Sequence, residues 1–145
     1  MSVTAAKGFE AAGVATGLKS TGALDVAMVV NRGPLRSAAA VFTSNRAKAN
    51  PILWSQQAVR DGVADVVVLN SGGANCFTGS FGFQTTHLTA ERAAELLGLA
   101  AGDVLVCSTG LIGYFMPMAR LEAGIPALCA DLNGAAAAAD AILTT

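Results

Sequence analysis

Apolar runs separated by glycine-rich breaks divide the first third of the chain into short elements. Residues 24–31 are apolar on both faces, which is typical of a strand inside a sheet. An Arg-Gly-Pro break at 32–34 separates them from residues 38–43, whose pattern predicts a second strand and therefore a hairpin. Upstream, four glycines indicate short strand pieces joined by turns: Gly8, Gly13, Gly17 and Gly22.

The next region predicts a short strand followed by a helix. Residues 51–54 are mostly apolar and favour a third strand. Ser55 has a side chain suited to capping the first turn of a helix, and Gly62 lies where that helix would end.

The middle of the chain carries the clearest pattern. Residues 64–70 are a β-branched run typical of a buried strand, and residues 103–108 form another apolar strand. Between them, residues 86–97 place their apolar side chains on one face of a helix, which Gly98 ends. The order strand, helix, strand predicts a βαβ-like unit within an α/β fold.

Two further helices are expected downstream. Pro117 suits the first turn of a short helix. Residues 134–143 form an Ala-rich helix that neither Gly nor Pro follows as a stop signal. Because domain boundaries normally lie in polar or Gly/Pro-rich chain, we expect residues 1–145 to be a single, incomplete domain.

Composition narrows the class of protein. The 145 residues are 53% hydrophobic and 13% charged, which excludes a disordered chain. A mean hydropathy of +0.54 suggests that a partner covers part of the apolar surface. The net charge of −1, without any Lys/Arg block, gives no reason to expect a nucleic-acid partner. No apolar stretch approaches the roughly 20 residues that cross a membrane, and no targeting pattern opens the chain, so we expect it in the cytoplasm.

The cysteines and the single histidine predict no metal site. Cys76, Cys107 and Cys129 have neither CxxC nor zinc-site spacing, so we expect free, buried thiols. His87 could form a thiolate–imidazole pair with Cys76. A structural role for both side chains is the favoured interpretation.

Two predicted strands end in loops with candidate chemistry. The Asn-Ser-Gly-Gly-Ala-Asn segment at 70–75 can expose backbone N–H groups to an anion, but it matches no phosphate-binding motif, which favours a structural turn. In the loop after 103–108, the hydroxyl of Thr109 and the N–H of Gly110 can converge on one oxygen, as in an oxyanion hole. Alone, such a sequence is usually a turn. No Ser/His/Asp set is present, so a nucleophile would use unusual chemistry or lie outside this chain.

Taken together and in order, these segments resemble the ornithine acetyltransferase (glutamate N-acetyltransferase) family over nearly the whole chain. The resemblance is carried by Lys7-Gly8-Phe9, Ala11-Ala12-Gly13-Val14, Gly22, Asp25, Val29, Ala40-Val41-Phe42-Thr43, Asn45, Lys48, Ala49, Pro51, Val68-Leu69-Asn70-Ser71-Gly72-Gly73-Ala74-Asn75, Thr78-Gly79, Cys107-Ser108-Thr109-Gly110-Leu111-Ile112-Gly113, Pro117-Met118 and Ala141-Ile142-Leu143-Thr144-Thr145.

The resemblance implies a layered α/β sandwich built jointly by two chains, of which this is the N-terminal part. Family members cleave themselves before an internal Thr, which becomes the nucleophile that carries acetyl from N-acetylornithine to glutamate. Thr109 and Gly110 would supply the oxyanion hole, and Thr144, beside Thr145, would contact substrate. The implied partners are the downstream chain and these two small molecules, in an assembly with two copies of each chain. No cofactor or metal is implied.

Some positions depart from the family pattern, and three interpretations follow. The family usually has Ala-Cys-Thr-Gly where 76–79 reads Cys-Phe-Thr-Gly, an Asp at Thr85, and a more polar stretch at 114–116. The segment that carries the nucleophile in the family is absent, so we expect no turnover by this chain alone. The alternatives to the acetyltransferase are a catalytically inactive fragment or interaction module, and a related self-cleaving aminopeptidase or amidase.

Overall fold

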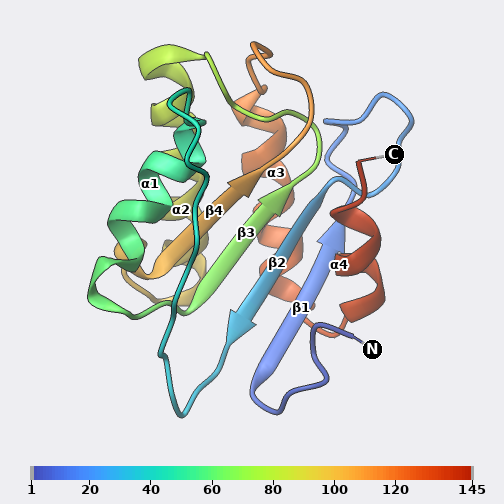
Figure 1. Ribbon diagram of the computed structural model, residues 1–145. Helices are drawn as coiled ribbons and strands as arrows, with labels where there is room; N and C mark the ends of the chain where they lie inside the picture. Colours follow the sequence, from blue (N-terminus) through green and yellow to red (C-terminus); the bar gives the residue numbers. More distant parts are fainter. Residues whose placement is uncertain (1, 145) are drawn as a thin grey trace.

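The computed structural model describes residues 2–144. Its centre is a mixed four-stranded sheet (Figure 1). Strand β1 (Phe9–Val14) pairs antiparallel with β2 (Val26–Asn31), and β2 pairs antiparallel with β3 (Val66–Asn70). Strand β3 pairs in parallel with β4 (Val104–Ser108). The sheet order is therefore the chain order, β1-β2-β3-β4.

Helix α2 (Gly79–Leu97) connects the parallel strands β3 and β4, which confirms the predicted βαβ unit. Parallel neighbours need such a crossover because both strands must be entered from the same edge of the sheet. The left-handed Gly98 ends α2 as expected, with φ 69°. A one-turn 3-10 helix, η2 (Ala101–Asp103), leads into β4.

The helix-covered face of the sheet holds the main core. Helices α2 and α3 (Met118–Ala130) lie behind the sheet in Figure 1. Alternate strand residues face these helices, as the two-residue period of a strand requires. The best-buried contributors are Val26, Met28, Val30, Val66, Val68, Val104, Val106, Leu121, Ile125 and Leu128.

Helix α4 (Ala135–Ala141) covers only the β1–β2 half of the opposite face. Its backbone comes so close to β1 that a Cβ on Gly13 would lie 2.1 Å from the carbonyl oxygen of Ala137, which requires glycine there. Beyond α4, strands β3 and β4 keep a partly exposed apolar surface that we call the open face: Val67, Leu69, Leu105 and Cys107.

Helix α1 (Asn50–Ala58) closes the free edge of β4 with side-chain hydrogen bonds, and the 3-10 turn η1 (Val59–Asp61) follows it. The indole Nε1–H of Trp54 donates to Val104 O (2.9 Å). The Ser55 hydroxyl donates to Val106 O (2.8 Å) and accepts from Val106 N–H (2.9 Å). Ser55 thus replaces a neighbouring strand at this edge.

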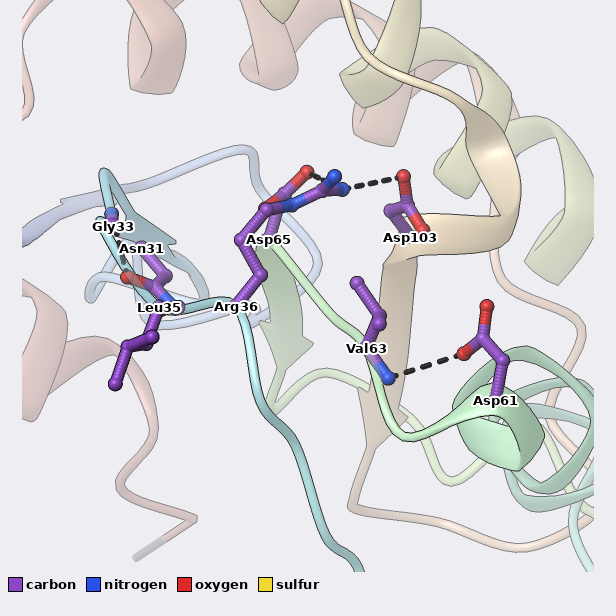
Figure 2. A network of polar contacts seen from close by, with 8 residues as sticks. All are labelled: Asn31, Gly33, Leu35, Arg36, Asp61, Val63, Asp65 and Asp103. Atoms are coloured by element: carbon purple, nitrogen blue, oxygen red, sulfur yellow. Dashed lines mark hydrogen bonds and ion pairs between the residues drawn. The ribbon is translucent and has the colours of Figure 1, made fainter.

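An ion-pair network at the end of the sheet where β3 and β4 begin fixes the chain after β2 (Figure 2). The Arg36 guanidinium bonds both to Asp65, whose side chain is 5% exposed, and to Asp103 at 2.6 Å. These two carboxylates stand just before β3 and β4. These hydrogen bonds raise the pKa of Arg36 above its ordinary value, and the bond to Asp65 contributes more than the bond to Asp103.

Several sequence predictions about elements are wrong. Residues 38–43 form no strand, because both edges of β2 are taken by β1 and β3, and Val41 is 99% exposed. Residues 51–54 belong to α1, with Pro51 in its first turn, so Ser55 lies inside this helix rather than at its cap. Gly62 does end the helical segment, with φ 78°.

Two helix boundaries also differ from the prediction. Helix α2 begins at Gly79 rather than Thr86, because buried side-chain hydrogen bonds stabilise a first turn of low helix propensity. Pro117 is the N-cap of α3, which is 13 residues long rather than short. The C-terminal helix is confirmed as α4, and no helix within residues 2–144 is long and apolar enough to cross a membrane.

We predict that Ser55→Ala lowers the free energy of unfolding by about 1–3 kcal/mol, because it leaves the N–H and C=O of Val106 buried without partners. Gln57→Ala is the matched control, since Gln57 is exposed on the same helix; it should change stability by less than about 0.5 kcal/mol. Urea unfolding monitored by Trp54 fluorescence measures both. Equal effects of the two substitutions would contradict the edge-closing role of Ser55.

Candidate functional site

The loops that follow β3 and β4 lie side by side, because parallel neighbours end at the same edge of the sheet. Three backbone hydrogen bonds join them: Thr109 N–H to Asn70 O (3.0 Å), Ala74 N–H to Leu111 O (3.0 Å) and Gly113 N–H to Cys76 O (2.9 Å). The Thr109–Gly110 segment is therefore held by its neighbour rather than left as a free turn.

Close backbone contact makes glycine necessary at Gly110 of this junction, and side chains restrict the space at Gly73. Gly110 has φ +130°, a conformation that L side chains rarely adopt, and a Cβ there would lie 2.8 Å from Gly73 N. A Cβ on Gly73 would meet Tyr114 Cδ1 at 3.1 Å and Met116 Cγ at 3.2 Å. Gly73 thus packs between Gly110 and the side chains of the following loop.

The two predicted donors are accessible and unengaged. Thr109 and Gly110 are both exposed, and within residues 2–144 neither the Thr109 hydroxyl nor the Gly110 N–H makes a hydrogen bond. Adjacent donors without an internal acceptor are available to an oxygen from outside. Such donors could stabilise a developing negative charge without reorganising first.

The bulky residues at 114–116 do not bury this tip. Met116 is buried and packs on Gly73, whereas Tyr114 and Phe115 are 40% and 56% exposed. The ring of Phe115 meets Phe81 edge-on at 5.5 Å. These side chains form an apolar rim next to the donors.

A buried amide network supports the loop after β3. Asn75, with φ 50° and 1% exposed, donates from Nδ2 to Gly82 O (2.8 Å) and to Thr86 Oγ1 (2.9 Å). The Thr78 hydroxyl donates to Asn75 Oδ1 (2.6 Å), and Asn50 Nδ2 donates to Thr78 Oγ1 (2.9 Å). This network ties the loop to α1 and α2.

Sequence reasoning missed this network, although one signal was present. Gly82 lies inside α2, where glycine is unfavourable, and a Cβ there would lie 1.9 Å from Thr78 Oγ1 and 2.2 Å from Asn75 Oδ1. A glycine inside a helix next to a loop rich in Asn and Thr indicates that side chains approach closely.

Thr144 lines a cavity of about 650 Å³ at the same end of the sheet. The loop after β4 contributes Leu111 to this cavity and the loop after β3 contributes Gly72, but Thr109 and Gly110 are not among the lining residues. Thr145 lies outside the described residues. The structure therefore brings Thr144 to the same loops as the donors, without placing all three in one cavity.

A buried aspartate holds the turn between β1 and β2, which contributes Lys19 to the lining of this cavity. Asp25 is fully buried, and its Oδ1 accepts from Thr16 N–H (2.7 Å) and from the Thr16 hydroxyl (2.9 Å). Its Oδ2 accepts from Lys19 N–H (3.1 Å), and its carbonyl accepts from Ser71 N–H (2.9 Å). The Lys19 ammonium donates to Leu24 O (2.9 Å). The turn between β1 and β2 is thereby locked to the loop after β3.

The three thiols are free, but only one is buried as expected. Cys76 is buried, Cys129 is half-buried and Cys107 is exposed. Cys107 faces the open side of the sheet because alternate residues of β4 point to opposite faces. Although Cys107 is exposed as a residue, desolvation raises the pKa of its thiol above the ordinary value, which favours the protonated form.

The side chains of Cys76 and His87 have separate partners. The Cys76 thiol contacts Ala47 O at 3.8 Å. His87 lies against Glu91, with Nδ1 3.3 Å from Oε1, and meets the Trp54 ring edge-on at 4.7 Å. This arrangement favours the structural role for both. Among residues 2–144, no three His, Cys, Asp or Glu side chains gather in a way that could hold a metal ion.

Comparison with known proteins decides the family. Residues 10–145 match the model of the ArgJ family. The chain belongs to the ArgJ family. It is 59% identical over 147 residues to the arginine biosynthesis bifunctional protein ArgJ of Streptomyces coelicolor, and 51% identical over 152 residues to that of Mycobacterium tuberculosis. These alignments cover 100% and 99% of the chain but 38% of each relative, whose N-terminal portion it matches.

Two solved ArgJ structures share the fold. A crystal structure of ornithine acetyltransferase complexed with ornithine, from Mycobacterium tuberculosis, superposes with a TM-score of 0.96 at 50% identity, covering 99% of this chain and 79% of that one. The arginine biosynthesis bifunctional protein argJ from Bacillus halodurans gives a TM-score of 0.91 at 37% identity, covering 100% of this chain and 76% of that one. The α/β fold class and the resemblance that the sequence indicated are confirmed.

We predict that Gly110→Ala costs about 2–5 kcal/mol of unfolding free energy, because it adds backbone strain to a collision with Gly73. Gly113→Ala is the control, since Gly113 has φ +77° but nothing within 4 Å of a new Cβ; it should cost about 1–2 kcal/mol. Chemical denaturation measures the difference. Hydrogen exchange of the Ala74 amide, which bonds to Leu111, should quicken only in Gly110→Ala. Equal losses would show that the contact is unimportant.

Proposed function

We propose that this chain supplies the oxyanion hole of an acetyltransferase that moves an acetyl group from N-acetylornithine to glutamate in arginine biosynthesis. Family membership supports this reaction over that of a self-cleaving aminopeptidase or amidase. The solved relative from Mycobacterium tuberculosis is an ornithine acetyltransferase complexed with ornithine. The observation that carries the proposal is the pair of exposed, unengaged donors on Thr109 and Gly110, held by the loop after β3.

The proposed reaction proceeds in two half-reactions through an acetyl-threonine. A Thr outside this chain attacks the acetyl carbonyl, and its own α-amine accepts the hydroxyl proton. The carbonyl oxygen becomes negative and receives hydrogen bonds from the Thr109 hydroxyl and the Gly110 N–H. The C–N bond then breaks, the proton passes to the leaving amine, and ornithine departs. The amine of glutamate attacks the carbonyl carbon of the acetyl-threonine ester, and the C–O bond to threonine breaks. The proton lost by the amine passes through the threonine α-amine to the threonine oxygen, and N-acetylglutamate departs.

Thr144 is proposed to contact substrate at the cavity beside this loop. The polar residues that line the cavity include Lys19, Ser71 and Asp140. Ammonium, hydroxyl and carboxylate groups are suited to the charged ends of an amino acid. Leu111, next to Gly110, belongs to the same lining, so a substrate bound there would be close to the donors.

The second chain of the enzyme is proposed to cover the open face. Val67, Leu69 and Leu105 are only partly buried there, and the chain spans 38% of the length of its curated relatives. We expect a precursor that cleaves itself before the nucleophilic Thr, an assembly with two copies of each chain, and a cytoplasmic location. The described residues hold no evident nucleophile–base pair, so this chain alone should show no acetyl transfer above the buffer rate.

We predict that Thr109→Ala lowers kcat by about 10²–10³-fold with little change in KM, because the lost donor acts on the transition state. Thr109→Ser keeps the hydroxyl and should recover most of the activity. Transfer of acetyl from N-acetylornithine to glutamate by the full gene product measures both. A wild-type kcat in the Thr109→Ala variant would refute the oxyanion hole.

Association through the open face predicts that Leu105→Lys weakens binding of the downstream chain at least about tenfold, because the interface would bury an unpaired charge. Leu96→Lys, at a leucine of α2 that is 40% exposed, is the control. Co-purification of the two chains after co-expression measures the effect. Unchanged recovery with Leu105→Lys, while both variants remain folded, would place the partner elsewhere.

A further inference from the structure

Asn70 interrupts the apolar pattern of β3 at its last residue. Val66, Val68 and Asn70 face the helix-covered core, and Asn70 is 5% exposed. A buried carboxamide must lose its hydration, so it is unfavourable unless both of its ends are hydrogen-bonded. In the register of the sheet, Asn70 lies between Val26 on β2 and Ser108 on β4.

Asn70 contacts the two residues that immediately precede Gly110. Its carbonyl oxygen accepts from Thr109 N–H at 3.0 Å, and its Nδ2 donates to Ser108 Oγ at 2.6 Å. One residue thus fixes both the backbone of Thr109 and the side chain of Ser108. These two restraints limit the movement of the backbone from which the next N–H, that of Gly110, projects.

The other end of the carboxamide has no partner. Asn70 Oδ1 is buried and makes no hydrogen bond to any described residue. Turning the carboxamide by 180° would pair the oxygen with the Ser108 hydroxyl and leave the nitrogen unpaired instead. A valine would continue the preceding run of valines and leave no polar atom unsatisfied. Stability alone therefore does not account for asparagine at this position.

We propose that Asn70 is a positioning residue for the oxyanion hole: through Ser108 and Thr109 it sets the direction of the two donors. This inference rests on the proposed function, because it assigns Asn70 a role in that same site. The unpaired carboxamide oxygen is a stability cost retained for the geometry of the loop. If the two donors were misplaced, the rate of the chemical step would fall more than substrate binding would weaken.

The sharpest test is the double variant Asn70→Val/Ser108→Ala in the full gene product. It removes the Asn70 carboxamide, with its unsatisfied oxygen, together with the Ser108 hydroxyl that pairs with the carboxamide nitrogen, so the urea midpoint should stay at or above that of the unmodified protein. We expect kcat to fall about 10–100-fold, with the KM values for N-acetylornithine and glutamate within about threefold. The effects of Asn70→Val and Ser108→Ala on kcat should not add up in the double variant, because each substitution breaks the same hydrogen bond, between Asn70 Nδ2 and Ser108 Oγ.

Single substitutions keep the test decisive if the double variant does not accumulate. Ser108→Ala alone should lower kcat by about fivefold or more, and Ser108→Thr, which keeps a hydroxyl for Asn70, should restore it. Ser55→Ala is the matched control, because Ser55 also bonds to β4 but away from the loop. It should lower the urea midpoint and leave kcat unchanged.

The outcomes separate this inference from the proposed function. A kcat within twofold of the unmodified protein in a folded Asn70→Val/Ser108→Ala variant overturns the positioning role, and so does a loss confined to KM. If Thr109→Ala lowers kcat in the same assays, only the role of Asn70 fails. If Thr109→Ala has no effect either, the oxyanion hole itself fails.

Discussion

The close approach of Gly110 to Gly73 is the contact on which the geometry of the site depends. A Cβ on Gly110 would lie 2.8 Å from the Gly73 nitrogen, so the two strand-end loops can meet only as bare backbone. Parallel pairing of β3 and β4 brings the loops to one edge, and hydrogen bonds between them hold Thr109 in place. The exposed donors are therefore a property of two loops together, not of the Ser-Thr-Gly sequence alone.

The sheet is closed at its edges and open on part of one face. The side chains of Trp54 and Ser55 take up backbone groups of β4. At the other edge, Ala11 N–H donates to Leu132 O (3.0 Å) and Ala11 O accepts from Gly134 N–H (2.8 Å). Additional strands are therefore disfavoured at these positions, and the apolar surface of β3 and β4 beyond α4 is where further chain can be buried. This agrees with the high hydropathy of the chain.

Polar groups inside the protein differ in how well they are satisfied. Asn75 and Asp25 use their side-chain oxygens and, for Asn75, the amide nitrogen in short hydrogen bonds that lock loops in place. Asn70 pairs only one end of its carboxamide. The side chain of Asn70 is incompletely hydrogen-bonded next to the exposed donors, whereas those of Asn75 and Asp25 are well bonded. This pattern is expected where the geometry of a loop is retained at a cost in stability.

Local sequence determined the features that depend on near neighbours along the chain. These are the apolar runs that became β2, β3 and β4, the glycine that ends α2, and the Thr-Gly pair placed after β4. Only the tertiary structure decided that residues 38–43 form no strand, that residues 51–54 are helical, and that α2 starts at Gly79. The reason is physical. A strand needs a free edge, and a weak helical turn needs side chains from elsewhere to support it; both belong to residues distant in the sequence.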